Sequence, residues 1–339
     1  MKNRLQNHII GCDWGTSSFR LRLINTVAQK VIAEIDAPEG VASTFEAWKK
    51  TGGSKSDKLL FFVLHLEKYV ALLASRSNLE LEGVEIVISG MASSSIGMRE
   101  IPYSTLPFEL DGTQVTIYRM EANAHFPHNI LLISGIRSDH DVMRGEETQM
   151  IGLAELLHLP ANKNFILILP GTHSKHLYLQ NNRLVDFQTY MTGELFNVIS
   201  NYSILKESVE ANTSACFSAQ ELAAFKTGVR ESDSVGILKN LFRVRTNQLF
   251  QKLNKKENGL YLSGLLIGAE IKQLLKETDA QLVLCSGNNL SELYEVAINE
   301  LNLSDRTRTV SSETVNQATV IGQLRIFQQQ ALVLNSATT

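Results

Sequence analysis

The sequence predicts an α/β protein built from two lobes. Its 339 residues, 44% hydrophobic and 20% charged, are enough for two domains that each bury a core. Two strands joined by a turn of glycine and hydroxyl residues occur once in each half, at residues 9–24 and 165–179. Further strands, and long helices after residue 193, complete the α/β pattern. We predict an N-terminal lobe over residues 1–130 and a C-terminal lobe over residues 131–339, with the last helix packing back on the first lobe.

Apolar runs and their period define the elements of the first half. Residues 9–12 form an apolar strand, and residues 19–24 return from the turn with apolar and basic side chains alternating, the pattern of a half-exposed strand. Residues 59–76 have the period of a helix. Short apolar runs predict two more strands, at residues 85–89 and 131–134.

The second half combines a second hairpin with long helices. The predicted strands cover residues 165–169, 176–179, 183–190 and 281–285. The predicted helices cover residues 148–157, 217–225, 234–252, 260–276, 291–301 and 316–330. The repeated hairpin indicates a weak internal duplication, and no low-complexity linker separates the two halves.

Composition excludes several classes of function. The formal net charge is -3 and no basic block occurs, which disfavours a nucleic-acid surface or an anionic-membrane surface. Three scattered cysteines, Cys12, Cys216 and Cys285, fit neither a disulfide framework nor a metal quartet. No signal-peptide pattern and no apolar run of about 20 residues is present. We expect a cytoplasmic protein without membrane or nucleic-acid partners, with a homodimer as an open alternative to a monomer.

The turn of the first hairpin has the composition of a phosphate-binding loop. Gly15 allows a tight bend and close approach of an anion, and Thr16 and Ser17 add hydroxyl donors to the backbone N–H groups. Asp13, just before the turn, could hold Mg²⁺ through water. An ordinary hairpin whose polar residues satisfy the turn amides is the alternative.

The second hairpin repeats this arrangement and adds a cation. Gly171, Thr172 and Ser174 repeat the Gly-Thr-x-Ser order, and Lys175 follows. A lysine in this place is more often solvated than bound to phosphate. Two such turns facing one cleft could nevertheless hold a polyphosphate and its metal, so the pair is more specific than either turn alone.

Two adjacent glutamates, Glu146 and Glu147, open the helix that follows Arg144. Carboxylates are favoured in the first turn of a helix, so both could be capping residues. Alternatively, one of them is a base directed at a sugar hydroxyl, because phosphoryl transfer asks mainly for positioning and charge neutralisation. Both interpretations stay open at this point.

Two weaker patterns complete the set of candidate residues. Thr192 and Glu194 stand at the end of the sheet region, where they are either a wall of the cleft or a strand-to-helix connection. Gly287 and Asn288 follow an apolar strand in a turn of small residues, against which a purine ring could lie.

Several stretches together resemble the 2-dehydro-3-deoxygalactonokinase family of the actin/hexokinase/Hsp70-type ATPase superfamily. The most specific are Arg-Gly-Glu-Glu-Thr-Gln at 144–149 and Pro-Gly-Thr-His-Ser-Lys at 170–175. The others are Asp-Trp-Gly-Thr-Ser at 13–17, Gly90 with Met91, Glu100 with Pro102 and Tyr103, and Met-Thr-Gly-Glu-Leu-Phe at 191–196. The resemblance implies an α/β, two-lobed actin-like ATPase (ribonuclease H-like) fold with the active site in the interlobe cleft.

The resemblance also implies a function: a cytoplasmic kinase of carbohydrate metabolism, a transferase that uses ATP and Mg²⁺. It would phosphorylate the terminal hydroxyl of a 2-keto-3-deoxy sugar acid. Asp13 would assist Mg²⁺, the two hydroxyl turns would clamp the phosphates, Glu146 would be the base in preference to Glu147, and the adenosine would lie by Gly287 and Asn288. Sugar-acid contacts would come from Gly90, Met91, Ser95, Arg99, Arg144, Thr192 and Glu194.

One stretch departs from the family pattern. Ser95 stands where the family has an arginine, and Met98 stands where it has a tryptophan. If that arginine binds the substrate carboxylate, then Arg99 or Arg144 substitutes for it here, or the sugar is different. Two other functions therefore stay open: an ATPase-only sensor of the same fold, and an enzyme acting on polyphosphate or an acyl phosphate.

Overall fold

The computed structural model describes residues 7–54, 57–210, 217–232 and 236–337, which form two compact units. Unit 1 contains the chain up to Leu159, the short segment Asn182–Leu184, and the C-terminal helix from Asn316 on. Unit 2 contains Pro160–Asn181 and Val185–Val315. Cys216 lies outside the described residues, and Cys12 and Cys285 are buried free thiols whose pKa values are raised by burial.

The sheet of unit 1 has the strand order β3-β2-β1-β4-β8-β7. β1 pairs with β2 antiparallel and with β4 parallel, and β4 pairs with β8 parallel. The strands are β1 (His8–Trp14), β2 (Phe19–Asn25), β3 (Lys30–Ala37), β4 (Glu85–Gly90), β7 (Ile117–Met120) and β8 (Ile130–Ile133). A small second sheet contains β5 (Ser104–Thr105), β9 (Ile136–Arg137) and β10 (Val142–Met143).

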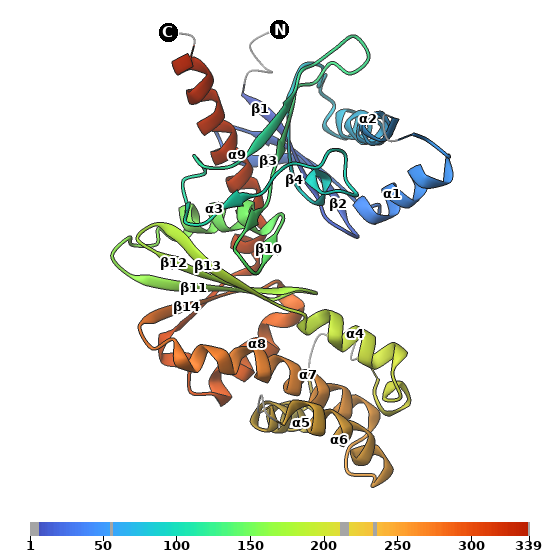
Figure 1. Cartoon of the computed structure of the whole chain (residues 1–339), viewed down its shortest axis with the longest axis vertical. Coiled ribbons are helices and arrows are strands. Elements are labelled where there is room, and N and C mark those ends of the chain that lie inside the picture. The colour runs from blue at the N-terminus through green and yellow to red at the C-terminus, as the bar shows by residue number, and fades with distance from the viewer. Residues whose placement is uncertain (1–6, 55–56, 211–216, 233–235, 338–339) are drawn as a thin grey trace. The chain divides into compact units, whose positions relative to one another are not determined.

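Helices cover both faces of this sheet (Figure 1). On one face, α2 packs its apolar stripe of Phe62, Leu66 and Leu73 into a core shared with the sheet. On the other face, α3 and α9 cross so closely that a Cβ on Gly152 would lie 1.8 Å from the Ala318 carbonyl oxygen. The helices of this unit are α1 (Val41–Lys50), α2 (Lys58–Ser77), α3 (Glu146–Leu157) and α9 (Ser312–Ala337, in this unit from Asn316 on).

Unit 2 repeats the same strand order, as β13-β12-β11-β14-β15. β11 pairs with β12 antiparallel and with β14 parallel, and β14 pairs with β15 parallel. The strands are β11 (Asn164–Leu169), β12 (Ser174–Gln180), β13 (Arg183–Tyr190), β14 (Ala280–Cys285) and β15 (Thr307–Val310). The short strand β6 (Phe108–Glu109) pairs with the first residues of β13.

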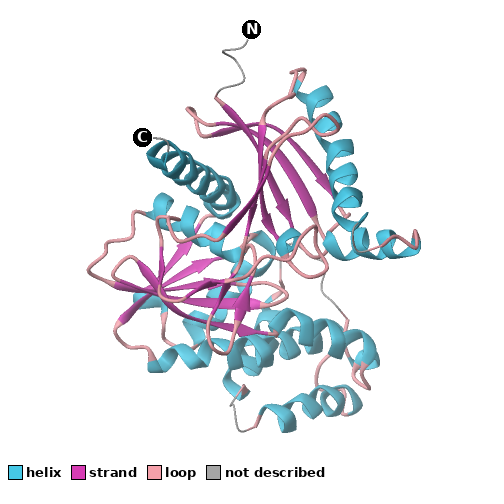
Figure 2. Ribbon diagram, turned by 45° about the horizontal axis from the view of Figure 1, so that its top comes forward, coloured by secondary structure: helices cyan, strands magenta, loops and turns pink. Residues whose placement is uncertain are grey.

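Two cores, one shared with the sheet and one away from it, are formed by the helices of unit 2 (Figure 2). Two of them begin with capping boxes, at Ser218 with Glu221 and at Asn254 with Glu257, where side chain and backbone satisfy each other's donors. The helices are α4 (Thr192–Tyr202), α5 (Ala219–Glu231), α6 (Ile237–Leu249), α7 (Lys255–Ile271) and α8 (Asn288–Glu300). Short 3₁₀ turns occur at Met91–Ser93, Lys206–Ser208, Lys272–Lys276 and Ser304–Arg306.

The duplicated strand order confirms the predicted α/β, actin-like (ribonuclease H-like) fold class. Both predicted hairpins are present, as β1–β2 and β11–β12. Sequence periodicity did not predict β3, β7, β15 or α1, which are short or half-exposed elements with many polar residues. In the part of the chain that the structure describes, no helix is both long enough and apolar enough to cross a bilayer.

Candidate active site

The first hairpin places Asp13 as the second-last residue of β1, before a turn of four residues. The Gly15 N–H donates to the Ser18 carbonyl at 2.9 Å and closes that turn, while Thr16 and Ser17 are exposed. Burial raises the pKa of Asp13. The positive charges of Arg22 and Arg20 oppose this rise in the pKa, and the negative charge of Glu146 adds to it. The carboxylates of Asp13 and Glu146 are therefore close enough to repel each other.

The start of α1 packs against the carbonyl side of this turn. The Val41 N–H donates to the Gly15 carbonyl at 2.9 Å, and the Ala42 N–H donates to the Thr16 carbonyl at 3.0 Å. The contact requires a glycine at position 40, because a Cβ there would lie 2.3 Å from the Thr16 oxygen. Among the described residues, the N–H groups of Thr16 and Ser17 have no acceptor, so they are available to an anion.

Two glycines bring the start of α3 to the end of β1. Gly90 ends β4 at φ 91°, where a Cβ would lie 2.6 Å from the Trp14 carbonyl oxygen. Gly145 precedes α3 at φ 105°, where a Cβ would lie 3.3 Å from the Gly90 Cα. Because only glycine adopts these conformations at such close range, the ends of β1 and β4 and the start of α3 converge at one place.

The two glutamates at the start of α3 have different environments. Glu146 is half-buried, and its Oε2 accepts the Arg144 N–H at 3.1 Å. Glu147 is 1% exposed; it accepts the Gly145 N–H at 2.7 Å and the Thr148 hydroxyl at 3.0 Å. Burial, followed by the charge of Glu146, raises the pKa of Glu147 to about 8. Only Glu146 therefore offers an accessible carboxylate.

Arg144 braces the loop that follows β4. Its guanidinium donates to the Ser93 hydroxyl at 2.7 Å and to the Ile101 carbonyl at 3.1 Å, and it stacks 4.0 Å above the Tyr103 ring. These contacts tie the residue before Gly145 to both ends of the 93–103 loop. Arg144 therefore fixes the 93–103 loop relative to the start of α3.

The residues that depart from the family pattern lie on this loop. Met98 is 3% exposed and packs in the core of unit 1, so its role is apolar packing. Ser95 is exposed, and its carbonyl accepts from the Lys58 ammonium at 2.7 Å. Arg99 is exposed and stacks 4.0 Å above the Tyr118 ring. Met91 is half-buried beside Gly90.

In unit 2, as in unit 1, the start of a helix packs against the carbonyl side of the hairpin turn. The Glu194 N–H, in the first turn of α4, donates to the Thr172 carbonyl at 3.0 Å. A Cβ on Gly193 would lie 2.7 Å from the Gly171 carbonyl oxygen and 2.8 Å from the Thr172 Cα. Thr172 and His173 are exposed, and within the described chain their N–H groups have no acceptor. His173 also pairs with the Glu194 carboxylate.

The side chains that follow this turn point into unit 2. Ser174 is fully buried and donates to the Glu270 carboxylate at 2.6 Å. Lys175 is 4% exposed, and its ammonium donates to the His173 carbonyl at 3.3 Å, which keeps its charge beside the turn. The buried hydroxyl of Thr192 also donates to Glu270. Thr192 and Glu194 thus belong structurally to the second hairpin.

The turn after β14 has an open backbone. Gly287 lies in an extended conformation before α8, and a Cβ there would meet nothing within 4 Å. Asn288 opens α8, and its side chain is outside those described. A flat ligand could reach this backbone without a steric clash.

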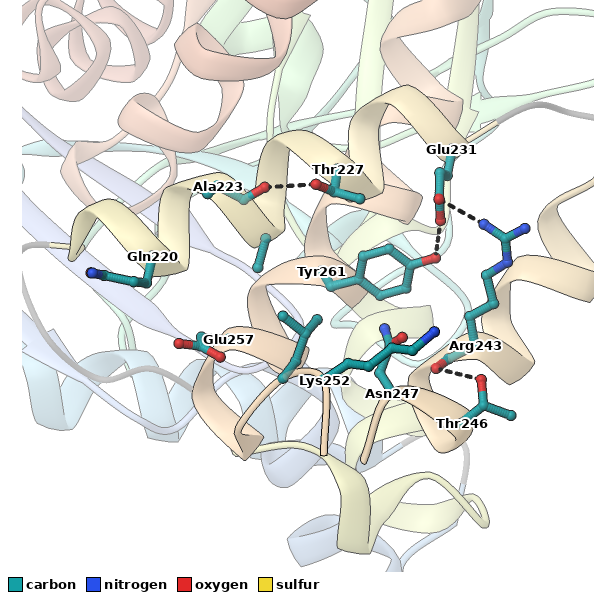
Figure 3. A pocket seen from close by; sticks show the side chains of 12 residues that line it. Gln220, Ala223, Thr227, Glu231, Arg243, Thr246, Asn247, Lys252, Glu257 and Tyr261 are labelled. Atoms are coloured by element: carbon teal, nitrogen blue, oxygen red, sulfur yellow. Dashed lines mark hydrogen bonds and ion pairs between the residues drawn. The ribbon is translucent and has the colours of Figure 1, made fainter. Parts of the chain in front are cut away.

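Two cavities contain none of the predicted site residues. One, of about 780 Å³, lies among α5, α6 and α7. In it the Glu231 carboxylate accepts from the Tyr261 hydroxyl at 2.5 Å and pairs with Arg243 at 2.6 Å (Figure 3). The other, of about 370 Å³, lies beside Glu155 and Arg325 in unit 1. No group of three or more His, Cys, Asp or Glu suited to a metal occurs among the described residues.

Sequence reasoning missed Gly40 and Glu270, and it included Gly193 only as part of the 191–196 stretch, without a role. The two glycines carry no signal of their own, because their importance comes from a turn that is distant along the chain. Glu270 is separated from Ser174 by 96 residues and from Thr192 by 78, so only the fold brings them together.

Comparisons with known proteins identify the family of this chain. The model of the 2-keto-3-deoxy-galactonokinase family matches residues 13–323. A Rhizobium meliloti protein named a probable 2-dehydro-3-deoxygalactonokinase is 34% identical over 87% of this chain and 90% of its own length. The Escherichia coli 2-dehydro-3-deoxygalactonokinase is 31% identical over 70% of this chain and 77% of its own. A Sinorhizobium meliloti crystal structure carrying the same kinase name superposes with a TM-score of 0.75 at 30% identity, over 94% of this chain and 96% of that one.

Proposed function

The chain belongs to the 2-keto-3-deoxy-galactonokinase family, and we propose that it transfers a phosphoryl group from ATP to the terminal hydroxyl of a 2-keto-3-deoxy sugar acid. One observation carries the proposal: the family match extends from Asp13 to Gln323 and so includes every candidate site residue. The names of the two curated relatives agree with a sugar-acid acceptor.

Glu146 is the residue best suited to accept the proton of the sugar hydroxyl. Its carboxylate is accessible and is held by the Arg144 N–H. Glu147 is also held by a backbone N–H, but it is not accessible, and burial together with the charge of Glu146 raises its pKa to about 8. In phosphoryl transfer the position of the base matters more than its basicity. The close approach of Gly145 to Gly90 would set the position of the Glu146 carboxylate.

The two hairpin turns are suited to bind the phosphate oxygens of ATP. On its exposed side each has N–H groups without an acceptor among the residues that the structure describes, at Thr16 and Ser17 in unit 1 and at Thr172 in unit 2. Gly15 and Gly171 allow close approach of the anion. Lys175 contributes positive charge beside the second turn, whereas Ser174 supports the turn from inside.

The residues at the first hairpin fit a Mg²⁺ ion, which would neutralise charge on the phosphates during transfer. The carboxylates of Asp13 and Glu146 repel each other, and burial raises the pKa of Asp13. A divalent cation between two carboxylates reduces this repulsion. Carboxylate oxygens are preferred Mg²⁺ ligands, commonly through water. Asp13 would hold the ion, and Gly287 with Asn288 would border the adenosine.

The sugar acid needs a cation for its carboxylate. Arg144 is already committed to Ser93 and the Ile101 carbonyl, so its role is to shape the loop. Arg99 is exposed on the same loop, and we assign the carboxylate to it. Gly90, Met91 and Ser95 then form the neighbouring surface for the sugar.

A coupled ADP-release assay with Mg·ATP tests the proposed function. The acceptors are 2-keto-3-deoxygalactonate, 2-keto-3-deoxygluconate and a panel of neutral sugars, with an acceptor-free reaction as control. Release that depends on either keto-deoxy acid supports the proposal. Release only with a neutral sugar refutes the sugar-acid assignment, and release without any acceptor would identify an ATPase.

A further inference from the structure

A single buried carboxylate, that of Glu270, lies behind the second hairpin. The side chain comes from α7 and is 2% exposed. Its Oε1 accepts from the Ser174 hydroxyl at 2.6 Å and from the His176 ring at 3.1 Å. Its Oε2 accepts from the Thr192 hydroxyl and from the Tyr294 hydroxyl at 2.9 Å. Four donors from three elements, β12, α4 and α8, therefore meet on one acid.

This network is saturated. An ionised carboxylate has about four acceptor sites, and all of those on Glu270 are used. His176 Nδ1 is buried without a partner among the described residues, so the ring contacts Glu270 through Nε2. Burial, followed by the charge of Glu270, raises the pKa of the Tyr294 hydroxyl, so that hydroxyl remains a donor. A buried charge is tolerated only when it is satisfied in this way.

The donors hold both sides of the exposed turn. Ser174 is the first residue of β12, directly after the turn, and Thr192 is the first residue of α4. Next to Thr192, the Glu194 N–H donates to the Thr172 carbonyl, and Gly193 packs against Gly171. The direction in which the turn N–H groups point is therefore set by the distance between β12 and α4. Glu270 fixes that distance.

We propose that Glu270 is a positioning residue for the nucleotide: by holding Ser174 and Thr192 together, it orients the Gly171–His173 turn toward the phosphates of ATP. The proposal rests on the proposed phosphate role of this turn. It also gives Thr192 a role in nucleotide binding in place of the sugar contact expected from sequence. The acid itself touches no substrate.

Steady-state kinetics with both substrates test the proposal. Glu270→Gln keeps the shape of the side chain but replaces one acceptor oxygen by a donor. We expect the KM for ATP to rise on the order of tenfold, while the KM for the sugar acid stays within about twofold. Glu231→Gln is the matched control, because that acid also accepts from a tyrosine hydroxyl in unit 2, in a cavity whose lining includes no residue of the hairpin (Figure 3).

A second pair of variants keeps the test valid if Glu270→Gln does not fold. Thr192→Val removes one donor with little change in shape, and Thr192→Ser restores it. We expect the KM for ATP to rise about threefold to tenfold in Thr192→Val and to return in Thr192→Ser. A rise in the KM for the sugar acid alone would overturn the proposal, as would an equal response in Thr192→Val and Thr192→Ser.

Thr172→Pro separates this inference from the proposed function, because it removes a backbone N–H that is proposed to bind phosphate. If Thr172→Pro weakens ATP binding but the Glu270 and Thr192 variants match the Glu231→Gln control, the positioning role is wrong and the phosphate turn stands. If none of the hairpin variants changes the KM for ATP, the phosphate role of the turn is wrong, and the positioning role fails with it.

Discussion

Replacing Glu147 by glutamine should stabilise the protein at neutral and alkaline pH. Glu147 is 1% exposed, and burial together with the charge of Glu146 raises its pKa from the ordinary value of 4.5 to about 8. Between these two values the folded chain holds a proton that the unfolded chain has lost. Stability therefore falls as pH rises through this window, and the loss is complete above pH 8.

The size of the effect follows from the shift. At ~1.4 kcal/mol per pKa unit, a rise from 4.5 to about 8 destabilises the folded state by about 5 kcal/mol above pH 8 and by about 3 kcal/mol at pH 7. Below about pH 4.5 the contribution vanishes, because both states are protonated. Glutamine resembles the protonated acid, and it can accept the Gly145 N–H while its amide faces the Thr148 hydroxyl.

Urea unfolding at pH 5 and pH 8 measures this contribution directly. We expect the unfolding free energy of Glu147→Gln to exceed that of the wild type at pH 8, with the difference largely gone at pH 5. Glu146→Gln is the control: removing the neighbouring charge should lower the pKa of Glu147 and weaken the pH dependence. An identical pH dependence in the wild type and Glu147→Gln would show that the buried carboxyl is not held neutral.

Three further changes test the site. Glu146→Gln should lower turnover by about 10²–10⁴ with little effect on ATP affinity, while Glu147→Gln stays near normal; single-turnover rates of both variants decide between the two acids. Lys175→Ala should raise the KM for ATP rather than that for the sugar acid, and the opposite pattern would remove the second hairpin from phosphate binding. Gly193→Ala should weaken ATP binding and lower Tm, because its methyl group would lie 2.7 Å from the Gly171 oxygen. An unchanged KM for ATP would show that ATP binding does not depend on the close packing of α4 against this turn.

The hairpins could be predicted from sequence because their signals are local. In β1–β2 and β11–β12, apolar strands flank a turn that contains glycine and hydroxyl residues, and each interaction lies within a few residues. The convergence of Gly90 with Gly145 could not be predicted in this way. The parallel pairing of β1 with β4 places Gly90 beside Trp14, and only the fold of the segment between β4 and α3 brings Gly145 to Gly90.

The second turn shows how a local pattern can suggest a role that the fold distributes differently. The Gly-Thr-x-Ser pattern gives Thr172 and Ser174 the same phosphate role. The fold separates them, because Thr172 is exposed in the turn whereas Ser174 is the first residue of β12 and donates to the buried Glu270. The inward partner has no sequence signal, because it comes from a helix 96 residues away.

At both hairpins the start of a helix binds the carbonyl oxygens of the turn, which explains why a glycine-hydroxyl turn alone is an ambiguous signal. A hairpin turn presents carbonyl oxygens as well as N–H groups, and exposed carbonyls repel phosphate. In each unit a helix that follows the third strand donates its first N–H groups to those carbonyls, from Val41 and Ala42 in one case and from Glu194 in the other. Glycines at positions 40 and 193 let the helix approach closely enough. The turn is thereby left with donors on its open side, so the proposed phosphate site depends on the hairpin and on the helix that packs against it.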